Sequence, residues 1–197
     1  MMRNLIFDFG RVLVGFDPYR LYYRYFGDKE KASWFVENVI TEDWVRRLDI
    51  GQPFDECVSE LQLRYPEYQE AIALYDTCYQ EMVTGEISGM YDLIHRNKAK
   101  GMKVYGLTNW SYKVYDVIRR YPVFVMMDGM VISSEVHQLK PDVAIYQCLT
   151  EKYALTADEC VFVDDRVENV EAARRIGMKG VIFKDSEQLN IELSRII

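Results

Sequence analysis

Three apolar runs of the sequence end on side chains that could perform chemistry. These side chains are Asp8 after the first run, Thr108 and Asn109 after the second, and Asp164 and Asp165 after the third. Carboxylates that gather at one point repel each other unless a cation lies among them. Oxygen ligands without clustered His or Cys suit a hard ion such as Mg²⁺. A single acid at a strand end can equally be a helix cap or a turn residue. The prediction of a metal site therefore rests on the combination of these residues.

The runs themselves are typical of buried parallel strands. Continuous apolar character is expected where helices cover both faces of a sheet. The predicted strands are NLIFD (4–8), MKVYGLTN (102–109) and CVFVDD (160–165), with GVIF (180–183) and MVIS (130–133) as further strands. Helical spacing lies between them, ending near Gly101 and again near Gly177. This alternation predicts an α/β doubly wound parallel sheet, whose ligands bind beyond the carboxyl ends of the strands.

Residues 17–85 differ from the rest of the chain. They are rich in aromatic residues at helical spacing, and Gly51-Gln52-Pro53 and Tyr65-Pro66 interrupt the pattern. We expect a small helical bundle inserted after the first strand, with its aromatic residues forming a core. The predicted division is therefore a core domain, residues 1–16 and 86–197, and a helical cap domain, residues 17–85.

Composition excludes several classes of function. The formal net charge of -7 over 197 residues argues against nucleic-acid binding, which uses basic patches. The four cysteines are widely spaced and are expected to be free thiols. No signal peptide and no membrane-spanning run is recognised, so a cytoplasmic protein without a membrane partner is expected. The oligomeric state is not predicted.

Four motifs in order resemble those of the haloacid dehalogenase-like hydrolase superfamily. They are FDFGRVL with Asp8, LTNWS with Thr108, LKPD with Lys140, and FVDDRVENV with Asp164 and Asp165. The match runs from residue 5 to about residue 185. The resemblance implies a Rossmann-like core, an inserted helical cap, and phosphatase activity on a small phosphorylated substrate.

The resemblance also assigns roles to individual residues. Asp8 would be the nucleophile and would form an aspartyl-phosphate. Thr108, with Asn109 beside it, would bind a phosphate oxygen, and Lys140 would balance the charge of nucleophile and phosphate. The ligands of Mg²⁺ would be Asp8, the backbone carbonyl of Gly10, Asp164 and Asp165. Asn169 would orient that group. A carboxylate nucleophile replaces one difficult hydrolysis with two easier steps.

Gly10 departs from the pattern of most phosphatases of the superfamily, which carry a second aspartate at this position as the acid–base group. General acid–base catalysis is typically worth about 10² to 10⁴ in rate. FDFGRVLVGFD is similar to a branch that includes α-D-glucose-1-phosphate phosphatases and also lacks this aspartate, although Arg11 differs from it. Asp17 is a candidate replacement acid, with a turn role before Pro18 as the alternative.

Other functions remain as alternatives. A catalytically weak protein of the same fold that binds phosphate or a protein partner is the main one, and the intact motif residues speak against it. Haloacid dehalogenases work without a metal and would leave the acidic pair unpaired. A response-regulator receiver carries its acidic pair on the first strand, whereas here the pair comes last.

Overall fold

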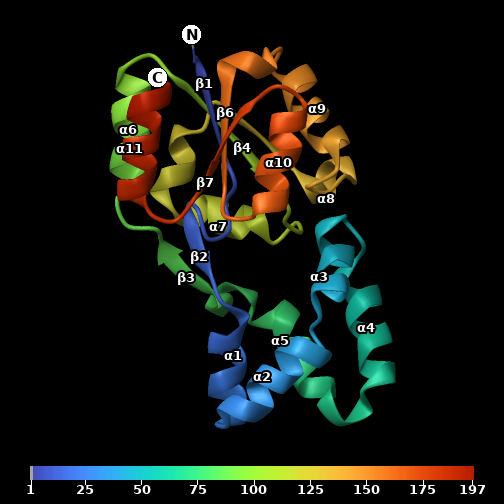
Figure 1. Cartoon of the computed structure of the whole chain (residues 1–197). Helices are drawn as coiled ribbons and strands as arrows, with labels where there is room; N and C mark the ends of the chain where they lie inside the picture. Colours follow the sequence, from blue (N-terminus) through green and yellow to red (C-terminus); the bar gives the residue numbers. More distant parts are fainter. Residues whose placement is uncertain (1) are drawn as a thin grey trace.

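The computed structural model of the protein describes residues 2–197. A five-stranded parallel sheet forms its centre (Figure 1). Its strands are β1 (Asn4–Phe7), β4 (Lys103–Thr108), β5 (Gly129–Ile132), β6 (Cys160–Asp164) and β7 (Lys179–Ile182). Their spatial order is β5-β4-β1-β6-β7, and every neighbouring pair is parallel. The five predicted strands are thus confirmed to within two residues at each end, and β1 lies in the middle of the sheet.

Helices cover both faces of this sheet. The helices of one face are α6 (Met90–Ala99), α7 (Val114–Arg120) and α11 (Ser186–Ile196), and those of the other are α9 (Val143–Lys152) and α10 (Val167–Arg175), with the short α8 (Ser133–Val136) after β5. The side chains of β1 alternate between the two layers: Leu5 and Phe7 belong to one buried cluster, and Ile6 belongs to the other. This burial on both faces explains why the strand sequences are apolar without alternation.

Five helices lie between two short strands that follow β1. They are α1 (Pro18–Phe26), α2 (Lys29–Asn38), α3 (Glu42–Asp49), α4 (Phe54–Arg64) and α5 (Gln69–Thr77). The strands are β2 (Val14–Phe16) and β3 (Val83–Glu86), which pair in antiparallel fashion. The sequence analysis did not anticipate this pair. Short 3-10 helices occur at Pro66–Tyr68, Tyr79–Met82, Pro122–Met126 and Ala157–Glu159.

The inserted helices, α1–α5, pack around their own aromatic residues, as expected. Tyr22 and Phe35 are fully buried, with ring centroids 4.7 Å apart. In Figure 1 these helices lie below the edge of the sheet at which the parallel strands end. They therefore lie on the side of the sheet where the strand ends carry the candidate site.

Helix α3 is the inserted helix that packs against the short helix α8. Thr41 begins it, because its Oγ1 accepts a hydrogen bond from the backbone N–H of Trp44 at 3.3 Å. Trp44 and Leu48 form its buried side. The helix ends at Asp49.

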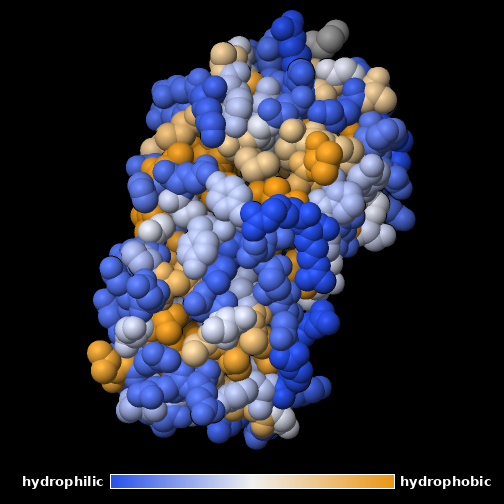
Figure 2. All heavy atoms as spheres, turned by 180° about the vertical axis from the view of Figure 1, so that it is seen from behind, coloured by the Kyte–Doolittle hydropathy of each residue, from blue (hydrophilic) through white to orange (hydrophobic). Residues whose placement is uncertain are grey.

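Neither the surface nor the cysteines indicate a particular function. Figure 2 shows a mostly hydrophilic back face on which hydrophobic side chains reach the surface in small patches. All four cysteines are free thiols. Within residues 2–197, none of the helices has the length and apolar character that crossing a membrane requires.

Candidate active site

The three acidic residues predicted at strand ends lie together. Asp8 follows β1, and Asp164 ends the neighbouring β6. The two strands are in register with Phe7 opposite Val163, and the backbone N–H of Asp8 donates to the Val163 carbonyl at 2.9 Å. One carboxylate oxygen from each of Asp8, Asp164 and Asp165 lies within 4.8 Å of the others. The parallel register therefore brings residues more than 150 positions apart into one cluster.

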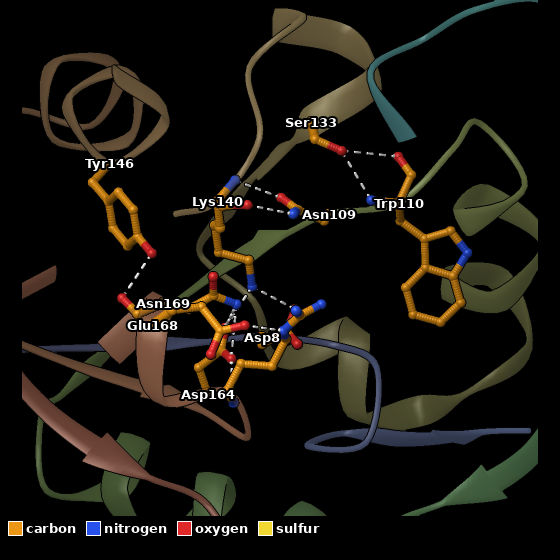
Figure 3. A network of polar contacts seen from close by, with 10 residues as sticks. Asp8, Asn109, Trp110, Ser133, Lys140, Tyr146, Asp164, Glu168 and Asn169 are labelled. Carbon is orange, nitrogen blue, oxygen red and sulfur yellow. Dashed lines mark hydrogen bonds and ion pairs between the residues drawn. The ribbon is translucent and has the colours of Figure 1, made fainter. Parts of the chain in front are cut away.

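Lys140 joins two of these carboxylates (Figure 3). Its Nζ lies 2.8 Å from Asp8 Oδ1 and 2.6 Å from Asp164 Oδ2, and its side chain is 1% exposed. Burial alone would lower the pKa of Lys140, but the two carboxylates outweigh it and hold that pKa above its ordinary value. Lys140 is therefore a buried cation shared by two acids.

Asn109 holds the backbone of Lys140. Its Oδ1 accepts from the Lys140 N–H at 2.8 Å, and its Nδ2 donates to the Lys140 carbonyl at 2.9 Å (Figure 3). We predicted Asn109 as a phosphate-binding residue beside Thr108. That role stays a prediction, and the contact that the structure shows is a positioning one, which ties the end of β4 to the loop that carries Lys140.

Asp164 is fixed by residues of the turn and helix that follow it. The Asn169 Nδ2 donates to both of its carboxylate oxygens, at 3.0 and 3.1 Å, and the Arg166 N–H donates to Oδ1 at 2.9 Å. Tyr146 in turn donates its hydroxyl to the Asn169 carbonyl at 2.8 Å. Asn169 thus orients the carboxylate of Asp164.

The cluster carries more negative than positive charge. Burial raises the pKa of Asp8 to about 6, Lys140 lowers it, and the charge of Asp164 raises it further. Burial and Asp164 likewise raise the pKa of Asp165, which Arg11 and Lys140 oppose. Arg11 is largely exposed, and its Nη1 stands 4.0 Å from Asp165 Oδ2. Three carboxylates beside one buried ammonium form an oxygen-rich site that fits a divalent cation such as Mg²⁺.

Thr108 lies at the end of β4, next to this cluster in the sheet. The residue is fully buried, and its Oγ1 has no hydrogen-bond partner within residues 2–197. Buried hydroxyls are almost always hydrogen-bonded, so the unpaired Thr108 hydroxyl indicates a partner from outside the chain. A bound anion that accepts from this hydroxyl would supply the missing partner.

Gly10 lies in the turn after Asp8. A Cβ built on it would lie 3.6 Å from Trp110 Cζ3, which is ordinary van der Waals contact. Asp17, the alternative acid, instead caps α1, with its Oδ1 accepting from the Tyr19 N–H at 3.0 Å. Position 10 therefore has room for a side chain but carries no acid–base group, and Asp17 has the structural role considered as its alternative.

Two residues near the site were missed by the sequence analysis. Ser133 accepts the Trp110 N–H at 2.9 Å and donates its hydroxyl to the backbone carbonyl of Asp49 at 2.5 Å. Asp49 comes from α3, and its carboxyl is close enough to Asp8 and Lys140 for both charges to act on its pKa. Neither residue lies in a motif, and only the packing of α3 on the core brings Asp49 here.

Comparison with known proteins agrees with this geometry. The family model described as haloacid dehalogenase-like hydrolase matches residues 5–183, so the chain belongs to this hydrolase family. It is 27% identical to the sesquiterpene phosphatase astK of Aspergillus oryzae, over 98% of this chain and 95% of the relative. The similarity to a glucose-1-phosphate phosphatase branch stays a prediction.

Solved structures show the same fold. A HAD-like family hydrolase from Porphyromonas gingivalis superposes with a TM-score of 0.77 at 19% identity, covering 100% of this chain and 98% of that one. A HAD family enzyme from Bacteroides thetaiotaomicron, crystallised with magnesium and inorganic phosphate, gives 0.71 at 17% identity, covering 94% and 96%. The predicted α/β fold, a Rossmann-like sheet with inserted helices, is thereby confirmed.

Proposed function

We propose that this hydrolase is a Mg²⁺-dependent phosphatase that acts on a small phosphorylated metabolite through an aspartyl-phosphate intermediate. The observation that carries the proposal is the convergence of Asp8, Asp164 and Asp165 around one point, with Lys140 between two of them. The names of the relatives agree with it: one is a phosphatase, and another was crystallised with magnesium and phosphate.

Each residue has a role that its surroundings support. Asp8 is the nucleophile, and Lys140 neutralises it and the incoming phosphate. Thr108 donates its unpaired hydroxyl to a phosphate oxygen, with Asn109 holding Lys140 in place. Phosphoryl transfer depends mainly on positioning and on neutralising charge, and these residues supply both.

The ligands proposed for Mg²⁺ are Asp8, Asp164, Asp165 and the backbone carbonyl of Gly10. When bound, the ion would neutralise the charge that builds up on the phosphoryl oxygens. The three side chains are oxygen donors of the kind that Mg²⁺ prefers. Their excess negative charge, described above, is the property of the site that supports a cation.

We further propose that residues 17–85 act as a cap domain over a core formed by residues 1–16 and 86–197. The inserted helices lie at the carboxyl edge of the sheet, where a cap would exclude water and select the substrate (Figure 1). Sugar phosphates are one candidate class, from the sequence resemblance. Terpenoid phosphates are a second, because the relative astK is named a sesquiterpene phosphatase.

A substrate panel tests the proposal. Sugar phosphates, terpenoid phosphates, nucleotides and a generic aryl phosphate would be assayed with Mg²⁺ and with a chelator in its place. We expect Mg²⁺-dependent release of phosphate by the wild type and loss of at least about 10³-fold in Asp8→Asn, since no covalent intermediate can form. Equal rates for wild type and Asp8→Asn on every compound would refute catalysis and favour a phosphate-binding or partner-binding protein.

A further inference from the structure

The proposed reaction lacks one component at its usual place. An alkyl or sugar leaving group departs as an alcohol and needs a proton, and the water of the second step must lose one. Gly10 supplies no carboxyl, and Asp17 is engaged in capping α1. Asp164 is held by Lys140 and Asn169, and Asp165 faces Arg11. The acid must therefore come from outside the four motifs.

Asp49 reaches the site from the inserted helices. Two successive backbone carbonyls fasten the end of α3 to the core: that of Asp49 accepts from Ser133 Oγ at 2.5 Å, and that of Ile50 lies 2.8 Å from His137 Nδ1. Ser133 also holds the Trp110 N–H, two residues beyond Thr108. This arrangement fixes Asp49 next to the loop that follows β4.

The backbone that follows the end of α3 is also closely packed against the residues after β5. A Cβ on Gly51 would lie 2.7 Å from the Ser134 carbonyl oxygen and 2.9 Å from His137 Nδ1, so a larger residue would displace the end of α3. At the other end of the helix, Glu42 Oε1 lies 2.5 Å from Arg166 Nη1, and Arg166 donates its N–H to Asp164. Helix α3 is thus anchored at both ends to residues of the site.

The surroundings of Asp49 suit a group that exchanges protons. Burial raises the pKa of Asp49 to about 7, the N–H of Ser111 opposes this rise, and the negative charge of Asp8 adds to it. Arg46 on its own helix and Lys140 lower it. Tyr75 and Tyr79 also face it, and burial raises the pKa of each well above its ordinary value, so both hydroxyls are neutral.

A carboxyl that is about half protonated near neutral pH is suited to both directions of proton transfer. Asp49 keeps partial exposure, whereas Asp164 is fully buried. Asp49 lies where the end of α3 meets Ser133, beside the loop that follows β4.

We propose that Asp49 is the general acid–base residue of this phosphatase, acting from the inserted helices in place of the missing carboxyl at position 10. In the first step, an Asp8 oxygen bonds to phosphorus as the bond to the leaving oxygen breaks, and Asp49 gives that oxygen its proton. In the second, Asp49 takes a proton from water while the water oxygen bonds to phosphorus and the bond to Asp8 breaks. Each cycle returns both carboxyls to their starting states.

The inference rests on the proposed phosphatase activity, so its test begins with a substrate that needs no acid. 4-Nitrophenyl phosphate releases a leaving group that departs without a proton, and sn-glycerol 3-phosphate releases an alkoxide that requires one. Wild type and Asp49→Asn would be compared on both in rapid-quench experiments. The matched control is Asp43→Asn, an exposed acid on the same helix.

For Asp49→Asn we expect a burst of 4-nitrophenolate of about one per enzyme, followed by slow turnover as the aspartyl-phosphate accumulates. On the alkyl phosphate we expect a loss of about 10² to 10⁴ in rate without a burst. Asp49→Glu, which restores a carboxyl, should recover part of the alkyl rate, and Asp43→Asn should match the wild type. Asparagine can still accept from Ser111, and the backbone contact with Ser133 is unchanged, so the variant should fold.

The outcomes are distinguishable. If wild type and Asp8→Asn hydrolyse 4-nitrophenyl phosphate equally, the phosphatase function itself is wrong. If the wild type is active but Asp49→Asn keeps its alkyl rate, or loses the burst and the alkyl rate by the same factor, Asp49 is not the acid. If Asp17→Asn gives the burst pattern instead, Asp17 takes the role and the proposal is overturned.

Discussion

Lys140 Nζ lies 2.8 Å from Asp8 Oδ1 in the centre of the site, so the two groups form a direct ion pair. The proposed nucleophile is thus paired with a buried cation before any substrate arrives. The same ammonium also contacts Asp164, so a single side chain compensates two carboxylates of the cluster.

Replacement of Lys140 by methionine should therefore destabilise the fold. It keeps the length of the side chain but leaves Asp8 and Asp164 without their common partner, and breaking a buried ion pair costs about 3–5 kcal/mol. The loss should appear in urea denaturation at pH 7 without Mg²⁺ and should shrink when Mg²⁺ is added. Lys100→Met, at an exposed position, is the control. An unchanged urea midpoint for Lys140→Met would contradict the pairing.

Thr108→Val should separate binding from stability. The Thr108 hydroxyl has no partner within residues 2–197, so its removal breaks no hydrogen bond of the protein and the melting temperature should stay level or rise. Turnover should fall by about 10²-fold, the loss typical of one donor to a transition-state oxygen. Thr108→Ser should restore most of the rate. A large drop in stability with unchanged turnover would show a structural role instead.

Asp165→Asn should weaken magnesium binding. It removes one charged oxygen ligand and releases Arg11, and loss of even an outer partner of a metal site typically costs about 10–100-fold in affinity. Mg²⁺ titration followed by calorimetry or by thermal shift would measure the change, with the exposed Asp158→Asn as control. Identical Mg²⁺ affinities in the two variants would remove Asp165 from the metal site.

Asp128 should make the stability of the fold dependent on pH. Burial alone would raise its pKa, but the contacts of Lys98, the Val104 N–H and Lys103 prevail and hold the pKa below the ordinary value of 3.8. A depressed pKa means that the contribution to stability is present above pH 3.8 and is lost as the pH falls through the lower, folded-state value.

Asp128→Asn should accordingly destabilise the protein by about 1–3 kcal/mol at pH 7. Its Oδ2 accepts from Lys98 at 2.7 Å and from the Val104 N–H at 2.8 Å, so the change weakens contacts between α6 and the sheet. The difference between variant and wild type should shrink as the pH falls below 3.8. A difference that is the same at pH 7 and pH 3 would mean that charge is not its cause.

Much of the core could be predicted from the sequence because its signals are local. A buried parallel strand must be apolar throughout, and the chemistry of such a sheet lies where its strands end, so Asp8, Thr108 and Asp164 could be recognised in the chain itself. The convergence of the acids then followed from the parallel order of strands.

Asp49 could not be predicted in this way. Its position depends on how α3 packs against α8, which involves residues more than 80 positions apart, and its flanking sequence resembles any helix end. The same holds for the contact of Asn109 with Lys140, which arises from loop geometry. The β2–β3 pair was missed because its strands are three and four residues long and contain Gly15 and Gly85, which are unfavourable in strands.

The β2–β3 pair has a consequence for how this chain can change over time. Val14 pairs with Glu86, so the polypeptide departs from the sheet and comes back to it at adjoining points, and the intervening 71 residues contribute no strand to the five-stranded sheet. Shortening, lengthening or exchanging this segment would leave the hydrogen bonds between the five strands intact. The ribbon of two strands is thus a natural junction at which the same five-stranded sheet can be combined with different inserted segments, in evolution or by engineering.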